Sequence, residues 1–122
     1  YYKAVRGNVN DVFYYYREQA AVQAKQFQRA LDDLAKAIEL NPKELTYFSE
    51  LAVVNIRVGR NEEAIKVLKD ALEIDPKYGE AYRLIGVAQL QLKQNKEACA
   101  SFAKAKELGD PNVDALIEKH CK

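Results

Sequence analysis

The chain has 122 residues, which suits one small domain, and 48% of them are apolar while 30% are charged. That balance supports a buried core and excludes an intrinsically disordered chain. Lysine and arginine total 19 against 18 aspartates and glutamates, a net charge of +1, so the basic excess of a nucleic-acid or anionic-membrane binder is absent. No apolar run approaches the roughly 20 residues of a membrane span. We therefore predict neither nucleic-acid binding nor membrane insertion.

Residues 1–10 precede the first recognisable pattern in the chain. They read equally well as a partial helix, the tail of a preceding repeat, or as a frayed terminus. The chain begins with Tyr1 and has no signal-peptide pattern. The sequence therefore resembles one whose N-terminal part has been removed, and the absence of a signal peptide here does not exclude a targeting segment in the removed part.

From residue 11 onward, matching side chains recur at a period of 34 residues. A fixed period of this length is the signature of a repeat architecture. It predicts three repeats at 11–44, 45–78 and 79–112, each made of two helices. Alanines at fixed positions let two antiparallel helices approach closely. The matched columns are Ala30, Ala64 and Ala98; Ala37, Ala71 and Ala105; Tyr14, Phe48 and Tyr82; and Leu34, Leu68 and Phe102.

The turn between the two helices differs among the repeats. The first repeat has Lys25 and Gln26 there and lacks a glycine, which makes its turn less favourable. In the second repeat, Gly59 can adopt a positive φ and close the first helix, and Asn61 is expected to cap the second helix.

The second helices have recognisable ends. Asp75–Pro76 ends that of the second repeat, because a residue before proline avoids the helical region. In the third repeat, Asn95 is the expected cap and Gly109 the expected terminator. Apolar residues at helical spacing then follow in 113–122. Because a repeat array needs a terminal element with a polar outer face, we predict a capping helix there.

These patterns resemble the tetratricopeptide repeat (TPR) family over residues 11–112. The first repeat departs at Glu18, where the family has Gly or Ala. The resemblance implies an all-α fold: a right-handed α-solenoid of three TPR helix-turn-helix repeats with a C-terminal capping helix. In the third repeat the motif residues are Ala81-Tyr82, Ile85-Gly86, Ala98, Phe102, Ala105 and Asp110-Pro111.

The resemblance also implies a non-catalytic protein–protein interaction module, because the first helices of TPR arrays line a concave surface that holds a partner's peptide or helix. The central columns of that surface are apolar here, and an exposed apolar stripe needs a cover. Two alternatives stand: these side chains belong to the core, or the chain is a structural or self-associating segment of a longer TPR protein. The sequence does not identify the partner protein or peptide. The columns carried over as partner-binding are Tyr15, Gln19, Val22, Ser49, Val53, Ile56, Arg57, Arg83, Val87 and Leu90.

One subtype of the family is disfavoured. Some members clamp the acidic C-terminal tails of heat-shock chaperones with Lys, Asn and Arg in fixed columns. Those columns contain no cation in this sequence, and the two carboxylates among them would repel an acidic tail. We predict negligible binding to such peptides. The residues in these columns are Tyr15, Gln19, Glu50, Glu80 and Leu84.

Two cysteines lie near the C-terminus. Cys99 occupies an apolar column and is expected to face the next helix, where Cys121 lies. A disulfide between them would close a loop of about 23 residues and stabilise the fold by roughly 3 kcal/mol. The alternative is two separate buried thiols. A disulfide would favour a periplasmic or exported protein, and reduced thiols a cytoplasmic one.

No group of residues predicts catalysis or a cofactor. His120 is the single histidine, and it lies about 100° from Cys121 around a helix, so the two cannot easily face one metal ion with Cys99. The adjacent acids Asp32 and Asp33 diverge on their helix, and no glycine-rich phosphate loop is present. We therefore predict no enzyme, no cofactor and no metal site.

Overall fold

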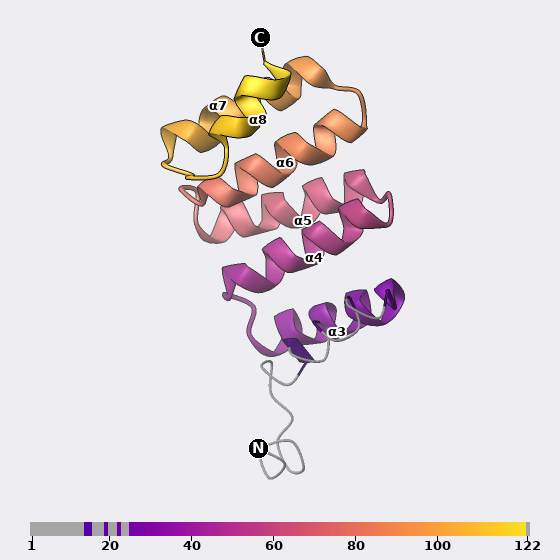
Figure 1. Cartoon of the computed structure of the whole chain (residues 1–122). Coiled ribbons are helices and arrows are strands. Elements are labelled where there is room, and N and C mark those ends of the chain that lie inside the picture. Colours follow the sequence, from indigo (N-terminus) through magenta and orange to yellow (C-terminus); the bar gives the residue numbers. More distant parts are fainter. Residues whose placement is uncertain (1–13, 16–18, 20–21, 23–24, 122) are drawn as a thin grey trace, which may run out of the picture.

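The computed structural model describes residues 14–15, 19, 22 and 25–121 (Figure 1). Within these residues the regular secondary structure is helix and no strand occurs, which confirms the all-α repeat fold. The predictions for 1–10 and for Glu18 lie outside the described residues. The helices are α3 (Phe27–Leu40), α4 (Leu45–Arg57), α5 (Asn61–Ile74), α6 (Gly79–Gln91), α7 (Asn95–Glu107) and α8 (Asp114–His120).

Helices that follow one another in the chain pack against one another, from α3 at one end of the stack to α8 at the other (Figure 1). In addition, α4 contacts α6 directly, although α5 lies between them in the sequence. The helices α4 and α6 are the first helices of the second and third repeats. The packing therefore brings these two helices together into one surface.

The core follows the alanine columns, as the period predicts. All six alanines are fully buried, since each has 0% of its surface exposed. Four of them, Ala30, Ala64, Ala98 and Ala105, belong to clusters that join α3 to α4, α4 to α5 and α6, and α6 to α7 and α8. Close helix contacts at small side chains thus hold the whole stack together. The six alanines are Ala30, Ala37, Ala64, Ala71, Ala98 and Ala105.

The turns inside the repeats share one backbone conformation. Gly59 has a φ of 86°, as predicted for a residue that closes a helix, and Gly109 ends α7 with a φ of 89°. Lys25 and Lys93 lie 34 residues to either side of Gly59 and also have a positive φ, at 61° and 64°. The position therefore demands a left-handed backbone even where the side chain is a lysine.

The predicted helix caps are wrong. Arg60 and Gln94 are the N-cap residues of α5 and α7, and Asn61 and Asn95 are the first helical residues. The helices start one residue early because the carbonyls of Arg60 and Gln94 already accept bonds from the amides four residues on. Asn61 is consequently only 7% exposed, and its Oδ1 has no hydrogen-bond partner among the described residues.

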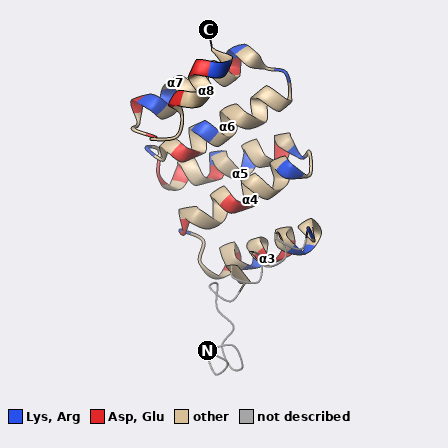
Figure 2. Cartoon of the chain, viewed as in Figure 1, with Lys and Arg blue, Asp and Glu red and all other residues tan. Residues whose placement is uncertain are grey.

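Charged residues of both signs are spread over the described helices. Figure 2 shows Lys and Arg interspersed with Asp and Glu over these helices.

None of the helices in the described part of the chain is long and apolar enough to cross a membrane.

Candidate functional site

The carried-over columns of the second and third repeats lie on α4 and α6. Glu50, Val53 and Arg57 follow the i, i+3, i+7 spacing of one helix face. Val87 falls in the same column as Val53, 34 residues later, and Leu90 lies three residues further along α6. We call these five residues, together with Glu80 at the start of α6, the α4–α6 face.

The apolar residues of the α4–α6 face are partly buried. Val53 and Val87 are partly buried and pack against the central cluster, which contains Ala52, Leu68 and Ala81. Leu90 is partly buried against the next cluster, around Phe102. Each therefore keeps an accessible portion while it supports the stack.

Ile56 was predicted to contact a partner, and this prediction is wrong. Only 9% of its surface is exposed, because it lies inside the central cluster. The one-residue steps along a helix turn the side chain by about 100°, so Ile56 points into the core while Arg57 points out and is exposed. The guanidinium of Arg57 lies 5.8 Å from the ring centroid of Phe27, within the range of a cation–π contact.

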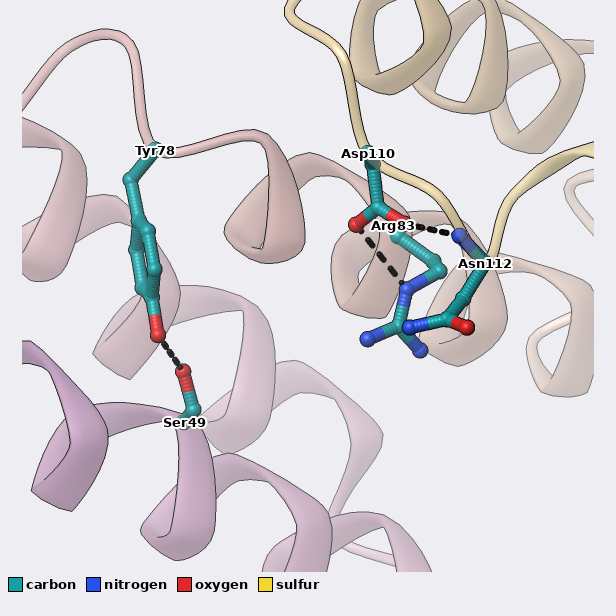
Figure 3. A network of polar contacts seen from close by, with 5 residues as sticks. All are labelled: Ser49, Tyr78, Arg83, Asp110 and Asn112. Atoms are coloured by element: carbon teal, nitrogen blue, oxygen red, sulfur yellow. Dashed lines mark hydrogen bonds and ion pairs between the residues drawn. The ribbon is translucent and has the colours of Figure 1, made fainter.

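The column that contains Ser49 and Arg83 makes contacts between structural elements. Ser49 is 3% exposed and shares a hydrogen bond between its hydroxyl and that of Tyr78, which precedes α6 (Figure 3). Arg83 Nε donates to Asp110 Oδ2 at 3.0 Å, and the Asp110 side chain is only 2% exposed. Asp110 also accepts from the backbone amide of Asn112 (Figure 3). The prediction that Ser49 binds a partner is wrong, because Tyr78 covers it, and Arg83 is held as an internal ion pair.

The first repeat contributes three predicted residues among those described. Tyr15 belongs to the same column as Ser49 and Arg83, and its ring lies 5.3 Å from that of Tyr47. Val22 packs against the cluster around Ala30, and Gln19 is partly buried. Tyr15 thus contacts the first turn of α4 in the second repeat, whereas Ser49 and Arg83 bind connections between helices.

The α4–α6 face is acidic at the end near the start of α6. Partial burial raises the pKa of Glu50, and the nearby carboxylate of Glu80 raises it further. The pKa of Tyr78 is also raised, first by burial, while its hydrogen bond with Ser49 acts in the opposite direction. A second negative charge would therefore be unfavourable beside Glu50.

A disulfide joins Cys99 on α7 to Cys121 just after α8, with Cα atoms 5.7 Å apart. Among residues 25–121 and the four described before them, no group of three His, Cys, Asp or Glu side chains is placed to hold a metal ion.

A shallow depression lies elsewhere, along one face of α5, and its lining mixes both charge signs. That lining consists of Glu62, Ile65, Lys66, Lys69 and Asp70.

Sequence reasoning missed Tyr78 and Asp110, the partners of Ser49 and Arg83. They lie 29 and 27 residues away in sequence. One signal was available: Ser49 and Arg83 share a column, and both partners lie in the connection that follows the second helix of their repeat. The chemistry of the two pairs differs, so no repeated motif marks them.

Known proteins agree with this architecture. A family model described as TPR repeat matches residues 56–93, and one described as Tetratricopeptide repeat matches residues 79–108. No curated protein matches the sequence. A mutant of MamA is 30% identical, with a TM-score of 0.73 over 85% of this chain and 76% of that one.

Two further solved structures resemble the whole stack. The TPR domain of Arabidopsis OM64 is 28% identical, with a TM-score of 0.80 over 89% of this chain and 91% of that one. The first TPR of Spaghetti (RPAP3), bound to the HSP90 peptide SRMEEVD, is 18% identical, with a TM-score of 0.81 over 92% of this chain and 90% of that one. The 34-residue period, the stacked helices and these matches agree, and the chain belongs to the tetratricopeptide repeat family.

Proposed function

We propose that this chain is a non-catalytic interaction module that binds a segment of a partner protein on the α4–α6 face. The observation that carries the proposal is the partial exposure of Val53, Val87 and Leu90 on two first helices that touch. Exposed Arg57 borders them. An apolar strip with a polar edge suits an extended or helical peptide that buries a few apolar side chains.

The structural relatives support this class of function. The first TPR of Spaghetti (RPAP3) is bound to an HSP90 peptide, and the second TPR domain of human RPAP3 is in complex with the HSP70 peptide SGPTIEEVD. Both are TPR domains of nearly the same length as this chain, which covers 90% and 95% of them.

We expect the ligand of this chain to differ in charge from those two acidic peptides. Glu50 and Glu80 lie close enough for one to raise the pKa of the other, and Arg83 is already paired with Asp110. Leu84, in one of the columns that acidic-tail binders use, is only 7% exposed. An acidic tail would therefore meet two carboxylates and no available arginine at this end of the face. We expect a neutral or basic segment with apolar anchors.

The test begins with peptides selected from a displayed random library on the purified chain. The variant Val53→Glu with Val87→Glu should weaken the selected peptides at least tenfold, because a buried charge at an interface is costly. The matched control is Val58→Glu with Ile74→Glu, which places the same charges on exposed apolar residues outside the face, 37% and 40% exposed. Circular dichroism checks that both variants keep their helices. Equal binding by both variants would refute the α4–α6 assignment.

The charge argument has its own test. Calorimetry with the peptide SRMEEVD should detect no binding up to high micromolar concentration, because Glu50 and Glu80 repel its glutamates. The double variant Glu50→Lys with Glu80→Lys should gain affinity for it. Micromolar affinity of the unmodified chain would contradict the assignment of ligand charge.

A structural role in a longer array is the second candidate. Leu40 and Ile74 occupy one column at the ends of α3 and α5, and they are 43% and 40% exposed. Repeated exposed apolar residues favour a surface that another chain or segment covers. Light scattering at several concentrations separates the two functions, since self-association gives a mass that rises with concentration.

A further inference from the structure

The last helix is held in an unusual way. Helix α8 has seven residues and no buried side chain of its own. Leu116 and Ile117 pack only partly against the terminal cluster, and Val113, just before the helix, is fully buried. A helix this short is not stable in isolation, so its order depends on what fixes it to α7.

The disulfide provides that attachment at the far end of α8. Val113 anchors the start of the helix, and Cys121, its C-cap residue, anchors the end. Helices α3 to α6 carry no disulfide among the described residues, and each of α3 to α7 buries at least three of its own side chains. Helix α8 is therefore the element whose position depends most on one bond.

The repeat register explains why a bond is found there. Cys99 stands in the column of Ile65, and Cys121 stands in the column of Val87. Ile65 and Val87 both pack against the central cluster between the second and third repeats. The disulfide thus occupies the place where the preceding repeat interface has two aliphatic side chains. Two free thiols would fill less of this space than isoleucine and valine do.

We infer that the Cys99–Cys121 bond makes α8 a redox-controlled cap, which a dithiol reductant releases from α7 while α3 to α7 stay folded. This inference is independent of the α4–α6 face. Both cysteines are partly exposed residues, so the bond lies near the protein surface, where a small reductant can approach it. Release would uncover the surface of α7 around Phe102, where a following repeat would stack in a longer array.

The chemistry is ordinary thiol–disulfide exchange. A thiolate of the dithiol attacks one sulfur of the Cys99–Cys121 bond, and the other cysteine leaves as a thiolate. The second thiol of the reductant then attacks the mixed disulfide and closes a cyclic disulfide. Two electrons and two protons pass from the dithiol to the protein, which ends with two cysteine thiols.

Amide hydrogen exchange with and without dithiothreitol tests the inference. The informative amides are those of Leu116, Ile117 and Cys121, which donate to backbone carbonyls at the start and middle of the helix. Reduction should accelerate their exchange by about tenfold or more, while amides of α4 and α6 change by less than about twofold. A thiol titration of the denatured protein counts zero free thiols before reduction and two after it.

Two variants sharpen the experiment. Cys99→Ser with Cys121→Ser should exchange rapidly in α8 whether or not dithiothreitol is present. Cys99→Ile with Cys121→Val copies the preceding interface and should keep α8 protected in both conditions.

Three results would overturn the inference. The first is unchanged protection of α8 in the reduced protein, and the second is equal acceleration in all the helices, which would mean that the bond stabilises the whole fold. The third is two free thiols in the protein purified under oxidising conditions. The exchange measurement on the unmodified chain decides the matter even if a variant does not fold.

Discussion

The second and third repeats use the same columns with different side chains. Where the second repeat has Ala52 and Leu68, both in the central cluster, the third has Gly86 and Phe102. A Cβ atom added to Gly86 would overlap the ring of Phe102. From the second repeat to the third, the first of these columns loses a methyl group and the second gains an aromatic ring. The two repeats therefore keep a similar filled volume with different residues.

The polar column follows the same rule with different chemistry. Ser49 and Arg83 occupy equivalent positions, and each binds the connection that follows the second helix of its own repeat. The second repeat does this with a neutral hydrogen bond and the third with an ion pair. Both repeats therefore tie their first helix to the connection after their second helix, while the strength of this contact differs between the two repeats.

The largest expected effect comes from Gly86→Ala. We expect it to destabilise the fold by about 3 kcal/mol, because the fully buried Phe102 has no room to move away. Adding Phe102→Leu recreates the alanine–leucine pair of the second repeat and should recover more than half of the loss. Urea unfolding of the two single variants and the double variant gives the coupling. If Gly86→Ala stabilises the protein, as helix propensity alone would favour, the comparison of volumes fails.

The next effect separates the two polar contacts. Arg83→Ala should cost about 2 kcal/mol, because it leaves the buried carboxylate of Asp110 without its cation. Ser49→Ala should cost about 1 kcal/mol, the usual range for a neutral hydrogen bond whose partner stays partly accessible. Unfolding free energies measured under the same conditions check the order. Equal losses would mean that the charge adds nothing to the third repeat's contact.

A smaller effect concerns the turns. Lys93→Gly should stabilise the protein by about 0.7 kcal/mol, because glycine removes the cost of a left-handed lysine, less the entropy glycine gains on unfolding. The matched change Gly59→Ala should destabilise it by about 1 kcal/mol, since the same backbone then strains an alanine. Thermal melts of both variants test the pair. A stabilising Gly59→Ala would show that the turn can relax to a negative φ.

The smallest effect depends on pH. Glu50 lies in the column of buried Leu84, and burial raises its pKa. The folded protein then holds this proton more tightly than the unfolded chain. Stability is lost as pH rises from the ordinary glutamate pKa, 4.5, through the higher pKa of Glu50. Because Glu50 is only partly buried, solvent screening keeps the effect to about 0.5 kcal/mol.

Glu50→Gln removes that loss. We compare the free energy of unfolding of this variant with that of the unmodified chain. The difference in favour of the variant should be larger at pH 7 than at pH 4, as urea unfolding at the two pH values measures. The other carboxylates titrate in both proteins and cancel. A difference of opposite sign would mean that the Glu50 carboxylate is stabilised by a partner in the folded state.

Much of the fold could be predicted because it repeats. The buried alanine columns and the positive φ of Gly59 and Gly109 follow from residue size and backbone freedom, which a sequence displays directly. Helix starts were less predictable. Asn61 has the chemistry of a cap, but the N-cap position of α5 falls on the preceding residue, Arg60, and the Asn61 side chain becomes buried.

The candidate site was only partly predictable. Register placed Val53 and Val87 on one face, because the 34-residue period holds through both repeats. It could not separate Ile56 from Arg57, since the boundary between core and surface depends on how tightly α4, α5 and α6 pack. It also could not pair Ser49 with Tyr78, because that bond needs the distance between two elements and not a pattern within one.

None of the N-cap residues of α3 to α8 makes a side-chain hydrogen bond to its helix. Short helices with open ends do not persist alone, so each depends on its neighbours for its order. A protease that cuts the chain at the turn around Gly59 would therefore leave two halves that both lose their shape. Splitting this protein into complementing fragments should succeed only when the pieces fold on contact with each other.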